Sequence, residues 1–260
     1  MSLPSSIFDK ERPVPMAQSY AEIKPILKWV YAWMLIGLIV TTAVAALTTT
    51  SPALVELRTN PIAAIGAMVV QIALVVALSW GIQRMSPSLA ALMFVIYAGV
   101  LGFSLSLIFL VFDIGSIVTA FATTAILFGA MTMLGFTTDI DLSRFRNLFL
   151  MALFGLVIAI VVNMFLGSGP LNFLISIIGV IIFMGLTAYD TQNIKRMAAA
   201  PEVQGDSAVL AKMSIFGALS LYLNFINIFL FLLQIMGGGR DSPLAHPTVD
   251  KNGTASAAPL

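Results

Sequence analysis

Long apolar stretches separated by short polar segments dominate this chain of 260 residues. A helix rises 1.5 Å per residue, so about 20 mostly apolar residues are needed to cross roughly 30 Å of hydrocarbon. The pattern predicts seven such spans, at 29–47, 62–80, 88–110, 114–136, 148–166, 171–189 and 215–236. The predicted fold class is therefore all-α, a polytopic membrane protein with seven transmembrane helices.

The third and fourth spans come from one stretch, 88–136, in which Asp113 is the single charged residue. One helix of that length would be about 74 Å long, more than twice the membrane thickness. The stretch must therefore fold back, and Asp113 lies almost at its midpoint. We predict that Asp113 is the N-cap of the fourth span.

Composition supports a membrane protein and excludes several other classes. Apolar residues make up 59% of the chain and charged residues 10%, which is too little charge for a soluble domain. There is no cysteine, and the single histidine is His246, so neither thiol chemistry nor a histidine cluster is available. We expect no enzyme activity and no bound cofactor. The scattered Lys and Arg residues do not predict nucleic-acid binding.

Around the transmembrane domain, taken as 29–236, we expect a cytosolic N-terminal tail at 1–28 and a disordered C-terminal tail at 237–260. The longest internal loop is predicted at 190–214. With the N-terminus in the cytoplasm, ten of the 13 Lys and Arg residues fall on the cytosolic side. The positive-inside rule therefore favours a cytoplasmic N-terminus.

Polar residues follow one face of the seventh span, namely Gly217, Ser220, Asn224, Asn227 and Gln234. The rest of this span is apolar, so we predict that the last helix turns this face inward and lies at the centre of the bundle. One interpretation is a packing face that holds helices together by close approach and hydrogen bonds. The other is a polar seam that lines a site or a narrow path.

Asp190 lies where the sixth apolar run ends. It is either a solvated carboxylate at a helix end or an acid that a partner holds there, because the helix dipole disfavours an acid at a C-terminus. Asn224 would lie roughly 13 Å deeper. The two meet only if the sixth helix dips, or if the seventh begins before Ile215, with Ser207 as its cap. Arg84, after the second span, is either a positive-inside anchor or a site residue.

Two segments, 183–195 (FMGLTAYDTQNIK) and 218–230 (ALSLYLNFINIFL), carry a resemblance to a known family. The chain resembles the Bax inhibitor-1 family over residues of about 20–237, in its bacterial inner-membrane branch. The resemblance implies a calcium-leak protein sensitive to hydrogen ions, in which two aspartates on the last two helices share protons and gate a pore. The first aspartate falls on Asp190, which would be the carboxylate for the metal ion. The second falls on Asn224, and an arginine that closes the gate falls on Arg84.

Asn224 departs from the family pattern because it is not an acid. Two adjacent carboxylates do not both ionise easily in a low dielectric, so a pair responds to pH. With an amide in place of one acid, we expect Asp190 to titrate alone, and pH gating to be weakened or moved to lower pH.

The leading hypothesis is therefore a cation leak or channel whose permeant ion is calcium. The proposed ion path contains Asp190, Asn224, Arg84, Asn227 and Ser220. The second hypothesis, which the resemblance also allows, is a regulator that binds membrane proteases or quality-control machinery through the N-terminal tail and the 190–214 loop. A small-solute transporter ranks third, because no pair of interrupted helices supports it.

Overall fold

The computed structural model describes residues 16–82, 84–199 and 206–237. Parts of the two predicted tails, 1–15 and 238–260, lie outside the described residues, as does His246. The helices are α1 (Met16–Thr50), α2 (Pro52–Thr59), α3 (Pro61–Gly81), α4 (Pro87–Leu105), α5 (Ile108–Val111), α6 (Ile114–Thr137), α7 (Arg146–Leu166), α8 (Gly169–Ala198) and α10 (Ser207–Gly237), with a 3-10 helix η2 (Leu142–Phe145) before α7. Within this described part, seven helical segments are long and apolar enough to cross a membrane, which confirms the all-α prediction.

Local sequence signals set the ends of these helices. Asp113 caps α6, because its carboxylate accepts a 2.9 Å hydrogen bond from the Ser116 backbone N–H, as predicted. Ser86 caps α4 in the same way, with Pro87 as the first helical residue. Gly167 ends α7 in the left-handed conformation, with φ of 60°, which glycine adopts without a steric penalty.

The third predicted span is interrupted near its end. The structure stops α4 at Leu105 and starts the short helix α5 at Ile108. At the break the Ser106 hydroxyl donates a 2.7 Å hydrogen bond to the Phe103 carbonyl. Hydropathy predicts no such break, because the span 88–110 contains neither a charged residue nor a proline.

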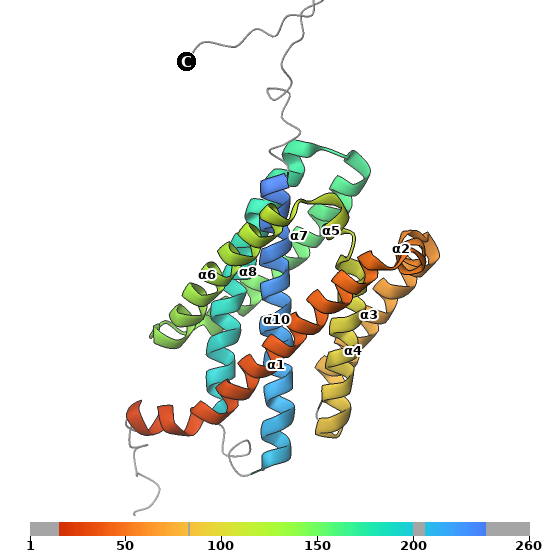
Figure 1. The fold of residues 1–260 in the computed structure, drawn as a ribbon. Coiled ribbons are helices and arrows are strands. Elements are labelled where there is room, and N and C mark those ends of the chain that lie inside the picture. Colours follow the sequence, from red (N-terminus) through yellow and green to blue (C-terminus); the bar gives the residue numbers. More distant parts are fainter. Residues whose placement is uncertain (1–15, 83, 200–205, 238–260) are drawn as a thin grey trace, which may run out of the picture.

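The last helix, α10, lies at the centre of the bundle (Figure 1) and packs against α1, α4, α6 and α8. In its most apolar stretch 67% of residues are buried, against 6% in the corresponding stretches of α3 and of the η2–α7 segment. Tyr222 of α10 is fully buried, and its hydroxyl lies 2.5 Å from the Thr41 hydroxyl of α1. The predicted central position of the last helix is confirmed.

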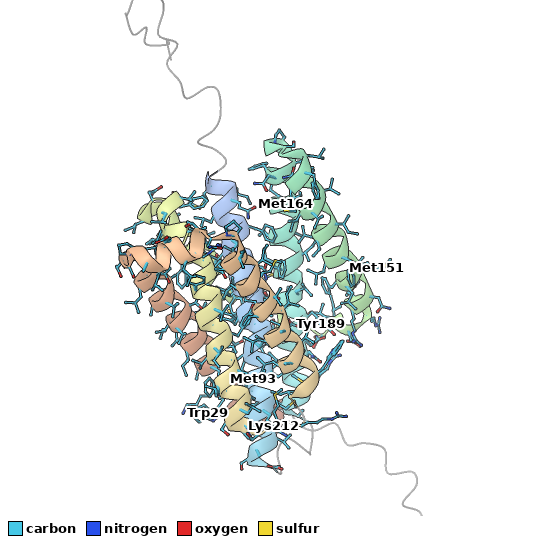
Figure 2. All side chains as sticks on the ribbon, turned by 90° about the vertical axis from the view of Figure 1, so that its right-hand side faces the viewer. Trp29, Met93, Met151, Met164, Tyr189 and Lys212 are labelled. Atoms are coloured by element: carbon cyan, nitrogen blue, oxygen red, sulfur yellow. The ribbon has the colours of Figure 1, made fainter. Side chains whose placement is uncertain are left out.

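The outer helices present apolar side chains outward. Met151 and Met164 of α7 are each 73% exposed and point away from the bundle (Figure 2). An exposed apolar surface of this extent is what lipid-facing helices require. Trp29, a residue type common at membrane–water interfaces, is half-exposed and lies at the same end of the bundle as Lys212 (Figure 2).

Both α8 and α10 are longer than hydropathy predicts. Helix α8 continues past Tyr189 to Ala198, and α10 begins at Ser207, so the predicted 190–214 loop is wrong at both ends. The polar extension of α8 stays helical because Thr191, Gln192 and Ile194 are buried against the bundle. The cap of α10 is Asp206 rather than Ser207, because the Asp206 carboxylate accepts a 2.7 Å hydrogen bond from the Ala208 N–H.

Candidate functional site between the last two helices

The close packing of α8 against α10 rests on small residues. The Phe231 ring of α10 lies over Gly179 of α8, where an added Cβ atom would come within 2.6 Å of the ring. Further along, Gly217 of α10 lies against Ile194 of α8. Because the residue numbers of these contacts increase along α8 and decrease along α10, the two helices run antiparallel. Polar side chains of the two helices meet at two levels of this interface, Ser176 with Gln234 and Asp190 with Asn224.

Asp190 and Asn224 meet within this interface. The Asn224 amide nitrogen Nδ2 donates a 2.7 Å hydrogen bond to Oδ2 of Asp190. Asn224 is 5% exposed and Asp190 is partly buried. Because α8 ends at Ala198, Asp190 lies about two turns inside the helix rather than at its end, which removes the difference in depth that hydropathy predicts.

The other predicted site residues do not join this pair. The Asn227 amide donates a 2.8 Å hydrogen bond to the Leu223 carbonyl of its own helix. Ser220 is partly buried one turn before Asn224. Gln234, near the far end of the same face, accepts a 3.0 Å hydrogen bond from the Ser176 hydroxyl. The polar face of α10 thus makes separate contacts rather than one continuous network.

Arg84 lies apart from the pair. It is exposed in the turn between α3 and α4, where its backbone N–H donates a 2.9 Å hydrogen bond to the Gly81 carbonyl. Among the described residues, no hydrogen bond or ion pair joins its side chain to Asp190 or Asn224. The gating role expected for Arg84 therefore rests on spacing along the chain, without contact between its described side chain and the pair.

The pair can contact a cation through a single carboxylate. In the part of the chain that the structure describes, no three His, Cys, Asp or Glu side chains gather closely enough to hold a metal ion. Calcium in a resident site takes six to eight oxygen ligands. Asp190 with one amide neighbour supplies fewer oxygen ligands than such a site needs.

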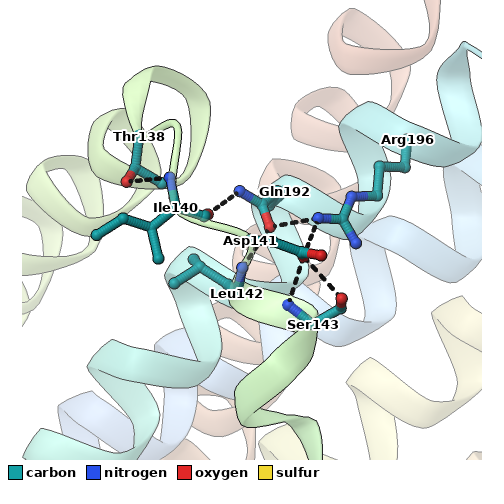
Figure 3. A network of polar contacts seen from close by, with 7 residues as sticks. All are labelled: Thr138, Ile140, Asp141, Leu142, Ser143, Gln192 and Arg196. Carbon is teal, nitrogen blue, oxygen red and sulfur yellow. Dashed lines mark hydrogen bonds and ion pairs between the residues drawn. The ribbon is translucent and has the colours of Figure 1, made fainter.

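A second polar cluster, which hydropathy does not indicate, lies in the last turns of α8, and Figure 3 shows its contacts. Gln192 holds the segment before α7 through two 2.9 Å hydrogen bonds, accepting from the Leu142 N–H and donating to the Ile140 carbonyl. Arg196 donates to the same Gln192 oxygen and forms an ion pair with Asp141. We call these residues, Ile140, Asp141, Leu142, Gln192 and Arg196, the loop clamp.

Hydrogen bonds from the Ser143 side chain and from Arg196 hold the pKa of Asp141 well below its ordinary value. Asp141 and Arg196 remain almost half-exposed, so their ion pair is screened by water. The two hydrogen bonds between Gln192 and the backbone therefore stabilise the loop more than the ion pair does. The available sequence signal was the spacing of Gln192 and Arg196, which puts them on one helical face.

The fold and its apolar exterior define an α-helical, multi-pass membrane protein. Residues 24–241 match the family described as inhibitor of apoptosis-promoting Bax1, and the chain belongs to this Bax inhibitor-1 family. It is 44% identical to the inner membrane protein YbhL of Escherichia coli over 226 residues, which cover 86% of this chain and 96% of YbhL. It is also 42% identical to a protein of Deinococcus radiodurans, over 85% of this chain and 93% of the relative. A Borreliella burgdorferi protein is 39% identical, over 82% and 91%.

Proposed function

We propose that the chain is a cation-leak protein of the bacterial inner membrane, with calcium as its permeant ion and Asp190 as the carboxylate on the ion path. The observation that carries the proposal is the 2.7 Å contact between Asp190 and Asn224 inside a helix pair of the spanning bundle. An ionisable residue within a transmembrane segment is costly and usually serves transport. The name of the Escherichia coli relative supports the inner membrane as the location.

The proposed orientation has the N-terminus in the cytoplasm. The turn with Arg84, the loop clamp with Arg196, and Lys212 near the start of α10 all belong to the end of the bundle from which α1 enters. Gathering these basic residues at one end fits the positive-inside rule. On this orientation, the loop clamp lies at the cytosolic surface.

In this proposal the Asp190–Asn224 contact is the closed position of the gate. A neutral amide can donate to Asp190 whether that carboxylate is ionised or protonated, so the contact does not depend on a shared proton. A pair of acids would need one proton to remain in contact. The amide thus supports a leak with weak pH dependence, in agreement with the departure from the family pattern.

The test is calcium uptake into proteoliposomes that contain a calcium indicator. Asp190→Asn preserves the size of the side chain and removes its charge, so we expect uptake to fall several-fold. Glu56→Gln is the matched control, because Glu56 is an exposed acid outside the pair, and uptake should stay at the wild-type rate. Equal uptake by wild type and Asp190→Asn would exclude Asp190 from the ion path.

A second candidate function is regulation through contact with membrane proteases or quality-control machinery. The observation that favours it is the loop clamp, which fixes a charged surface loop in one conformation and leaves Arg144 and Arg146 exposed beside it. Gln192→Ala would then weaken binding to a protease partner and leave calcium uptake unchanged. Loss of uptake in Asp190→Asn, with partner binding intact, favours the leak instead.

A further inference from the structure

An apolar cavity opens in the side of the bundle, in the half away from the N-terminal end. Its volume is about 340 Å³, which is in the range of pockets that hold small molecules. We call it the lateral groove. Its lining includes Ala45 of α1, Ile108 of α5, Val118 and Phe121 of α6, and Phe225 and Phe229 of α10.

The groove exists because α1 and α6 pack on different sides of α10. Helix α1 packs against α4, α8 and α10, and helix α6 packs against α8 and α10. Figure 1 looks onto this side, where the upper part of α10 is visible between α6 and α1. Phe225 and Phe229 form the floor and are each less than 10% exposed. At the rim, Val118 is 59% exposed and Phe121 is 43% exposed.

The lining offers water few polar partners. Twelve of the 14 lining residues are apolar, and the other two are Thr41 and Thr42. The Thr41 hydroxyl already bonds the Ala98 carbonyl and the Tyr222 hydroxyl, and the Thr42 hydroxyl donates to the Leu38 carbonyl. A buried water needs two to four polar partners, so an apolar cavity of this kind stays dry.

We propose that the lateral groove binds one acyl chain of a membrane phospholipid, from the leaflet opposite the N-terminal end. The groove opens among exposed apolar side chains of spanning helices, where the surrounding medium is hydrocarbon. Protein interiors are close-packed, and a void of this size leaves part of its apolar lining without close neighbours, although the Phe225 and Phe229 rings also pack against Phe121. A flexible hydrocarbon chain supplies those contacts, and it is present at every lateral opening of a membrane protein.

The lateral groove is separate from the proposed ion path. The Asp190–Asn224 contact lies between α8 and α10, whereas the groove is lined by α1, α4, α5, α6 and α10. A bound acyl chain would hold α1 and α6 apart at a fixed distance on the central helix. Lipid chain length and unsaturation would then act on the bundle from a site separate from the ion path.

The experiment uses the full chain in vesicles of phosphatidylethanolamine and phosphatidylglycerol that contain a phosphatidylcholine with a diazirine in its acyl chain. After illumination, the labelled residues are identified by mass spectrometry. We expect label at Phe225 and Phe229, although α10 is surrounded by other helices. Phe165 of α7, which is 81% exposed, reports ordinary lipid contact.

Val118→Trp places a large ring in the groove, and it should reduce label at Phe225 and Phe229 several-fold while label at Phe165 stays constant. Val69→Trp is the matched control, because Val69 is 56% exposed on α3, away from the groove, and should leave all label unchanged. Absence of label on α10 in the wild-type protein would overturn the proposal. So would label on α10 that Val118→Trp does not reduce, or crosslinking of the groove to a second copy of the chain.

Discussion

The Asn224 amide donates a 2.7 Å hydrogen bond to the Asp190 carboxylate across the interface of α8 and α10, between residues 34 positions apart. One partner can carry a charge and the other cannot. The contact therefore differs in kind from a pair of acids, which both accept hydrogen bonds when ionised and repel one another. Single substitutions at either position can therefore test what this contact does.

The first test restores an acid at position 224. In Asn224→Asp, two carboxylates face each other, and they stay in contact only while they share a proton. We expect calcium uptake by this variant to change steeply with pH, rising as increasing pH removes the shared proton, while wild-type uptake changes little. Uptake measured from pH 5 to pH 8 decides this. Identical pH profiles for the two proteins would contradict the role given to Asn224.

The strength of the contact can be measured by a double-mutant cycle with Asp190→Ala, Asn224→Ala and the double variant. Hydrogen bonds between transmembrane helices contribute about 0.6 kcal/mol on average in such cycles, and at most about 1.7 kcal/mol. We expect a coupling free energy between this average and this maximum, measured by reversible unfolding in mixed detergent micelles. The control cycle pairs Asp190→Ala with Asn227→Ala, whose amide bonds its own helix, and its coupling should be near zero. Equal coupling in both cycles would show that the Asp190–Asn224 bond contributes nothing specific.

Hydrophobic patterning predicts the helical framework well, because spanning helices are set by long apolar runs whose ends carry recognisable caps such as Asp113. It also predicts the central position of α10, because amides and small residues on one face of an apolar helix need partners within the bundle. Both predictions rest on local sequence signals, and the structure agrees with them.

The contact between Asp190 and Asn224 could not be predicted from hydropathy, because it depends on where α8 and α10 end. Polar residues after Tyr189 mark the end of an apolar run, and they do not mark the end of a helix whose buried side includes Thr191 and Ile194. Arg84 shows the opposite limit. The role expected for it rests on spacing along the chain, and in the described part of the structure no hydrogen bond or ion pair joins its side chain to Asp190 or Asn224.

Close packing of α6 on α8 should make one glycine far less tolerant than another in the same helix. A Cβ atom added at Gly135 would lie 2.5 Å from the Ala188 carbonyl oxygen and 2.9 Å from the Thr191 Cβ. We expect Gly135→Ala to lower the free energy of unfolding by about 1–3 kcal/mol, the usual cost of overpacking. At Gly129 nothing lies within 4 Å of the added atom, so Gly129→Ala should be neutral or stabilising by up to about 1 kcal/mol. Thermal unfolding in detergent compares the two, and equal losses would contradict the close contact.

The loop clamp should depend on Gln192 more than on its ion pair. The Gln192 side chain is 8% exposed and bonds two backbone groups, at Ile140 and Leu142, whereas the Asp141–Arg196 pair is almost half-exposed. We expect Gln192→Ala to speed hydrogen exchange at the Leu142 amide at least tenfold, because its acceptor is removed. Asn193→Ala, at the neighbouring position, should leave that amide protected. Similar exchange in the two variants would show that Gln192 does not hold the loop.

The same loop should loosen in acid. Because the pKa of Asp141 is held below its ordinary value, the stability that its ionised form adds is present above about pH 4 and is lost as the pH falls further. The Ser143 amide donates a 3.0 Å hydrogen bond to Asp141. After correction for the intrinsic pH dependence of exchange, this amide should therefore exchange faster below about pH 4. Asp141→Asn keeps an acceptor for this amide and removes the titrating group, so its protection should not change over the same pH range. If wild type and Asp141→Asn lose protection in parallel, the acid response arises elsewhere in the loop.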